Sequence, residues 1–192
     1  MVVDSEAPLQ RFLRNTESLV AVTTRNRIRL RQYERQAEGY LEIGMPQQAL
    51  DALERLTRAQ SLGSHGLYLR GKALADLGRY ADALTPLGEV ARVDPENIHV
   101  RLIQGWCHKR IGRIDLAVRD LETALRSSPD DALLHYNLAC YQSLAHNKRR
   151  ALRHLSRALV LDASFRTLID GESDFDPLRS DADFQALLGI GV

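Results

Sequence analysis

The stretch of sequence that decides the fold runs from residue 71 to residue 84 and reads GKALADLGRYADAL. The same pattern returns 34 residues later as GWCHKRIGRIDLAV, in residues 105–118. Less regular versions occupy residues 37–50, one period earlier, and residues 139–152, two periods later. Four units therefore align without insertions. A fixed period of this length indicates a helical repeat protein, in which each unit packs on its neighbours.

Three positions of the 34-residue unit keep their residue type for physical reasons. Position 8 is small and position 20 is alanine, so two antiparallel helices can approach closely. Position 15 is glycine in three units and His146 in the fourth, and glycine ends a helix by accepting a positive φ. The residues are Ala37, Gly71, Gly105 and Ala139 at position 8, and Ala49, Ala83, Ala117 and Ala151 at position 20. Each unit is therefore predicted to be a pair of antiparallel helices.

The composition agrees with an all-α class. Of 192 residues, 44% are apolar and 27% are charged, and six are proline. The net charge of +1 is uneven, since residues 170–192 carry −5. Cys107 and Cys140 are too few for a disulfide framework. No run approaches the roughly 20 apolar residues of a membrane span, and the N-terminus lacks a secretory pattern. We therefore expect a cytoplasmic location and no membrane contact.

In its motifs the chain resembles the tetratricopeptide repeat family. The resemblance covers residues 30–163, and four units agree in phase. The second unit carries Gly71-x-x-Leu74, Gly78-x-Tyr80-x-x-Ala83-Leu84 and Asp94-Pro95; the third carries Gly105, Gly112, Ala117, Leu121, Ala124-Leu125 and Pro129. The family's aromatic at position 4 is kept only as Tyr33, and Leu67, Arg101 and His135 replace it. The resemblance implies an α-solenoid of four helix-turn-helix repeats wound as a right-handed superhelix.

This frame divides the chain into three parts. Residues 1–29 are expected to form an N-terminal capping helix, with Asp4 or Ser5 as its N-cap. Residues 30–163 hold the four repeats, at 30–63, 64–97, 98–131 and 132–163. Residues 164–192 are expected to form a C-terminal cap and an acidic tail. In the cap, an apolar stripe continues through Phe165, Leu168 and Ile169, and a final helix from 182 to 188 carries Phe184, Leu187 and Leu188 on one face.

The family's binding surface can be carried over position by position. In the family, positions 2, 5, 9 and 12 of each first helix line the concave face. The resemblance thus implies a peptide-binding groove lined by His65, Tyr68, Lys72, His99, Leu102, Trp106, Lys109 and Tyr136, with Glu34 and Glu38 at the same positions of the first unit. Aromatic side chains beside cations suit a segment with an apolar anchor and acidic flanks. Two alternatives stay open: the aromatics pack internally, or the acidic tail, with Phe175 and Phe184, is itself the ligand.

We predict a non-enzymatic adaptor that holds an extended or helical segment of a partner protein in the concave groove. The alternative is a scaffold that associates with itself through its caps or by exchange of its tail. RNA binding comes third, because the arginine clusters spread over more than one helix face and nothing resembles a base-reading code. No nucleophile elbow, phosphate-binding loop or close pair of zinc ligands occurs. We therefore expect no enzyme activity, no cofactor and no metal.

Overall fold

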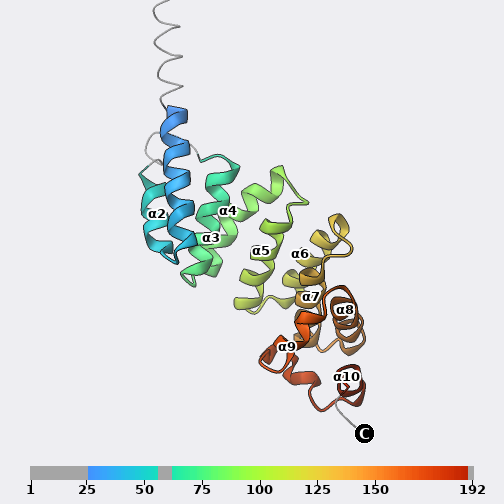
Figure 1. Cartoon of the computed structure of the whole chain (residues 1–192). Helices are drawn as coiled ribbons and strands as arrows, with labels where there is room; N and C mark the ends of the chain where they lie inside the picture. The colour runs from blue at the N-terminus through green and yellow to red at the C-terminus, as the bar shows by residue number, and fades with distance from the viewer. Residues whose placement is uncertain (1–25, 56–61, 190–192) are drawn as a thin grey trace, which may run out of the picture.

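The computed structural model describes residues 26–55 and 62–189, and all regular structure in these ranges is helical. Figure 1 shows the helices stacked side by side in a curved array, with the C-terminal segments below α7 and α8. Of the N-terminal capping helix expected in residues 1–29, residues 1–25 lie outside the described residues. No helix in the described part of the chain is long and apolar enough to cross a bilayer.

The described helices form four consecutive pairs, as the 34-residue frame predicts. The first pair is residues 26–42 with α2 (Pro46–Glu54), and the second is α3 (Ser64–Asp76) with α4 (Tyr80–Val93). The third is α5 (Ile98–Arg110) with α6 (Ile114–Ser127), and the fourth is α7 (Ala132–Leu144) with α8 (Lys148–Leu161). Residues 26–29 are continuous with the first helix of the first repeat, which therefore covers residues ahead of position 30.

The small residues lie at the contact inside each pair. All four alanines at position 20 are fully buried, as are the leucines at position 24, Leu53, Leu87, Leu121 and Leu155. A Cβ atom added at Gly71 would lie 2.5 Å from Leu87 Cγ, so the space at position 8 is already filled by position 24. The prediction that small side chains set the distance between the two helices is confirmed.

Position 15 closes the first helix of every repeat. Gly44, Gly78 and Gly112 have φ values of +71, +75 and +76°, and His146 keeps the same conformation at +55°. In each unit the next residue's amide donates to the carbonyl of position 11, as in Arg79 to Leu74 at 2.9 Å and Asn147 to Gln142 at 2.8 Å. This bond is typical of a helix that ends with a left-handed residue. Four identical turns keep the repeats in phase.

Buried apolar residues fall into two clusters. The first apolar cluster runs from Ala37 to Cys107 and includes the buried residues of the helices up to α5. The second apolar cluster runs from Ala117 to Phe184 and includes α6, α7, α8 and the C-terminal segments. The division falls inside the third repeat, between α5 and α6.

Four short segments form the C-terminal cap: η1 (Ala163–Phe165), α9 (Arg166–Ile169), η2 (Ser173–Leu178) and α10 (Ala182–Leu187). The predicted final helix is present, with Phe184 buried. Ile169 is buried as predicted. The prediction that Leu168 continues the same apolar stripe is wrong, because Leu168 is 53% exposed. The reason is local: the 3₁₀ turn at residues 163–165 breaks the helical period before Leu168.

Candidate functional site

The C-terminal cap covers the concave face of the fourth repeat. The ring of Tyr136, at position 5, stacks on Phe165 with centroids 4.8 Å apart and meets the edge of Phe175 at 5.8 Å. Phe175 in turn lies 5.6 Å from Phe184. Tyr136 is only 4% exposed. It was expected to line an open groove, and the structure places it under the chain's own aromatic residues instead.

Ion pairs hold the acidic cap on the basic body. Lys109, another expected groove residue, forms an ion pair with buried Asp174 and lies over the Tyr141 ring. At the other end of the cap, Lys148 contacts Asp181 at 2.6 Å and Asp183 at 2.7 Å, which ties α10 to α8. The charge asymmetry seen in the sequence therefore acts within the molecule. Lys109 and Tyr136 both belong to the contact with the cap.

The Cys140 thiol lies beneath the cap beside two carboxylates. Ligand atoms of Cys140, Glu172 and Asp174 lie within 4.8 Å of one another. Burial, and then the charges of Glu172 and Asp174, raise the pKa of Cys140 above its usual range. A thiol with two carboxylates is a donor set that a metal ion can use. Here the protein uses both acids itself: Asp174 pairs with Lys109, and Glu172 accepts a hydrogen bond from the Asp174 amide at 3.2 Å.

Two pockets hollow the surface that the predicted groove positions of the first three repeats form. One pocket of about 200 Å³ lies between the first helix and α3, lined by Glu38, Leu41, Glu42, Tyr68, Leu69 and Lys72. A second pocket of about 270 Å³ lies between α3 and α5, lined by Ser64, His65, Tyr68, Val90, Asn97, His99 and Val100. Tyr68 lines both pockets, and His65 and His99 are exposed. Four of the expected groove residues, His65, Tyr68, Lys72 and His99, therefore come together here.

Trp106 and Leu102 are half-buried on α5. The Trp106 ring meets Tyr80 edge-on, with centroids 5.1 Å apart, and packs against the first apolar cluster. Leu102 packs against the second apolar cluster. Part of each side chain is thus used in internal packing, which is the alternative that the sequence left open.

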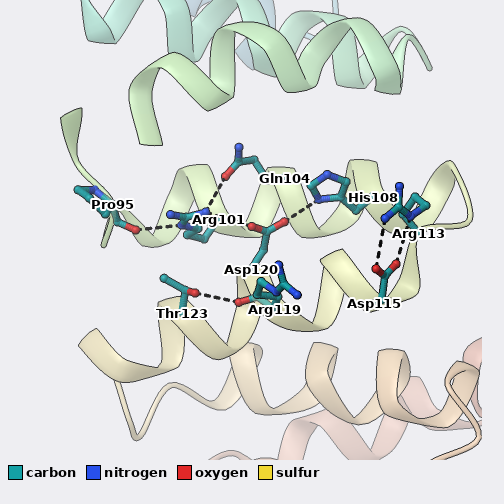
Figure 2. A network of polar contacts seen from close by, with 9 residues as sticks. All are labelled: Pro95, Arg101, Gln104, His108, Arg113, Asp115, Arg119, Asp120 and Thr123. Carbon is teal, nitrogen blue, oxygen red and sulfur yellow. Dashed lines mark hydrogen bonds and ion pairs between the residues drawn. The ribbon is translucent and has the colours of Figure 1, made fainter. Parts of the chain in front are cut away.

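A polar network between α5 and α6 was not predicted. Figure 2 shows Asp120 reaching from α6 toward Arg101 and His108 on α5. Asp120 accepts hydrogen bonds from the Arg101 guanidinium at 3.1 Å and contacts His108 Nδ1 at 2.7 Å. Arg101 also donates to the Pro95 carbonyl at 2.9 Å. The available signal was the charged residue at position 4, where the family usually has an aromatic.

The fourth repeat also has a polar residue at position 4, where the family usually has an aromatic one. His135, at position 4, contacts His154 of α8 through their Nδ1 atoms at 3.0 Å. His135 Nε2 lies 2.9 Å from the Pro129 carbonyl, which can only accept, so Nε2 donates. In the neutral pair, His135 Nδ1 must then accept from His154 Nδ1. In both repeats a polar residue at position 4 faces a polar residue 19 positions later.

A tetratricopeptide repeat family model matches residues 34–98 and 104–149, which is more than half of the chain. The chain belongs to the tetratricopeptide repeat family. No curated protein matches it significantly in sequence. The family match covers parts of all four repeat units.

Solved structures share this tetratricopeptide fold. The MamA RS-1 ArsTM double mutant has a TM-score of 0.71 at 22% identity, covering 84% of this chain and 90% of its own. Residues 41 to the end of MamA from Desulfovibrio magneticus RS-1 give 0.66 at 22% identity, over 84% and 94%. YrrB, described as a TPR protein with an unusual peptide-binding site, gives 0.65 at 19% identity, over 82% and 88%. At these identities the likeness concerns the fold alone.

Proposed function

We propose that the protein is a non-enzymatic adaptor that binds a segment of another protein on the open concave face of its first three repeats. The observation that supports this most is the cap on the fourth repeat. There, the concave face already holds a short segment of chain, with Phe175 against Tyr136 and Asp174 paired with Lys109. Over the first repeats, none of the described residues fills the two pockets at the corresponding positions.

The open surface has the anatomy of a small binding site. Its two pockets share Tyr68, and an aromatic ring between two hollows is a common anchor in protein interfaces. His65 and His99 flank the second pocket with exposed polar tips. YrrB, which has the same fold, is described as having a peptide-binding site, and this supports the same class of function here.

The test is a selection of random nine-residue peptides on the full-length protein, followed by fluorescence anisotropy of the enriched peptides. We expect dissociation constants near micromolar, about −8 kcal/mol, and a loss of about tenfold or more in Tyr68→Ala. Val160→Ala is the control, because Val160 is 73% exposed on α8, away from the pockets. Circular dichroism confirms that each variant is folded.

Two outcomes would reject the adaptor. One is that no peptide is enriched, or that Tyr68→Ala binds the enriched peptides as tightly as the parent. The other is a concentration-dependent dimer in sedimentation velocity that survives Tyr68→Ala while no peptide binds. The second result would favour the self-associating scaffold.

A further inference from the structure

Three glutamates form a stripe on the first helix, residues 26–42. Glu34, Glu38 and Glu42 follow one another at a spacing of four residues, which places them on one face of a helix. Glu38 and Glu42 are exposed and line the pocket of about 200 Å³. The Glu34 carboxylate lies against α3, because a Cβ added at Gly66 would be 2.9 Å from its Oε1. None of the three pairs with a cation among the described residues.

The two lysines of the same face are already paired. Lys72, which borders this pocket, contacts Asp76 at 2.8 Å, one turn along α3. Lys109 is held by Asp174 of the cap. The two lysines that favoured an acidic partner at the sequence level are therefore neutralised within the chain. The charge that remains at the rim of this pocket, from Glu38 and Glu42, is negative.

The pocket also has apolar walls of the right kind for a long cationic side chain. Leu41 and Leu69 are buried beneath it, and Tyr68 forms one side. Arginine places its methylene groups on apolar surface while its guanidinium stays at the polar rim. A guanidinium also stacks on aromatic rings and binds carboxylates with paired hydrogen bonds. Glu38 and Glu42, one turn apart, stand at that rim.

We propose that this pocket binds an arginine of the partner segment, with an apolar neighbour of that arginine seated at Tyr68. The partner is then a basic and apolar segment, rather than an acidic and apolar one. This inference rests on the proposed function and specifies the chemistry of the ligand. It uses charge complementarity at one end of the groove and the aromatic ring shared by the two pockets.

The test uses the peptides selected on the full-length protein. We expect enrichment of arginine next to an aromatic or aliphatic residue. The double variant Glu38→Gln/Glu42→Gln keeps the side-chain shape and should weaken these peptides by about tenfold, whereas Glu89→Gln, exposed on α4 and outside this pocket, should not. Raising NaCl from about 50 to about 200 mM should weaken the parent more than the double variant, since salt screens charge pairs.

The two proposals fail in different ways. Enriched acidic peptides, or peptides that lose affinity in Tyr68→Ala but not in the double glutamine variant, would overturn the arginine site and leave the adaptor intact. An absence of any enriched peptide would overturn the adaptor itself. Replacing the arginine of an enriched peptide by citrulline gives a further check, because it removes the charge and keeps the length. Unchanged affinity for the citrulline peptide would also overturn the arginine site.

Discussion

Gly71 and Gly105 occupy position 8 of successive repeats, but their surroundings differ. A Cβ at Gly71 would lie 2.5 Å from Leu87 Cγ, whereas one at Gly105 would lie 3.3 Å from Leu121 Cδ2. Both leucines are fully buried, so neither can swing into solvent. The second repeat therefore needs glycine at this position, and the third repeat is close to accepting alanine.

We expect Gly71→Ala to lower the free energy of unfolding by about 1–3 kcal/mol, the usual cost of overpacking a core. In Gly105→Ala, the gain in helix propensity, about 1 kcal/mol, should offset the tighter contact and leave stability nearly unchanged. Urea denaturation followed by circular dichroism measures both values. Equal losses in the two variants would show that the distance between the helices does not differ between the repeats.

The sequence predicts residues well where the repeat itself supplies the constraint. Ala83 and Ala117 are buried, and His146 adopts the turn conformation that glycine has in the other units. Tyr136 was assigned to the same groove by the same alignment, yet it is buried. Its exposure depends on Phe165 and Phe175, which follow the 34-residue repeats in the sequence and contact Tyr136 only in the folded chain. Periodicity carries no information on that contact.

At the scale of helices, the contact between α7 and α8 is polar as well as apolar. His135 and His154 face each other inside the helix pair, and both are buried. Burial, and then the charges of His135, Arg153 and Arg150, lower the pKa of His154 to about 4. In the unfolded chain the histidine pKa is about 6.5. The folded form therefore keeps His154 neutral over a range in which the unfolded form is protonated.

This difference predicts a pH dependence of stability with a definite sign. Between about pH 6.5 and 4 the unfolded state binds the additional proton, so stability falls as the pH falls, by up to about 3 kcal/mol. Above pH 6.5 this group contributes no slope. Urea unfolding measured at intervals from pH 7.5 to 4.5 should show the loss in the parent and a smaller loss in His154→Gln. The same slope in both proteins would contradict the assignment.

Element boundaries were predictable for the repeats and less so for the cap. The described repeat helices follow the 34-residue frame because glycine marks the end of the first helix in three units and proline follows the second helix in two. The cap consists of segments of six residues or fewer, too short for helical periodicity to place their faces. The Asp120 network could be predicted only in part. Arg101 stands out in the sequence, because position 4 usually holds an aromatic residue in the family. Its partner Asp120 could not be predicted from that position.

At the scale of the molecule, the two apolar clusters meet between α5 and α6, where Asp120 links the helices. In a repeat array each unit supports mainly its neighbours, so a local defect spreads little. Each cluster has a natural probe. Trp106 packs on the first, and Cys140 is buried in the second. Stability can therefore be read separately at the two ends.

We expect Phe175→Ala to open the cap without disturbing the first cluster. Truncating a fully buried phenylalanine costs about 3–5 kcal/mol, and here the loss falls on the contact with Tyr136 and Phe184. Cys140 should then react faster with a thiol reagent at pH 8, as burial no longer raises its pKa. Trp106 emission should stay unchanged.

Cys107 is the internal control for this experiment. It is fully buried in the first apolar cluster, where burial, followed by the charges of Asp120 and Asp76, raises its pKa to about 11. Mass spectrometry of the labelled protein distinguishes the two cysteines. If Cys107 and Cys140 gained reactivity together, and Trp106 emission shifted with them, the array would unfold as one unit and the two clusters would not be independent.

The cap gives the concave face one closed end, and this sets a polarity along the array. A chain lying on the face from the first repeat meets Phe175 and Asp174 at the fourth and can go no further. Within the described residues, the cap therefore blocks one end of this face. Such a surface suits a terminus or a looped-out segment that enters and leaves on the same side. If the proposed adaptor function is right, the protein holds its partner at one place on this face and does not slide along a long polymer.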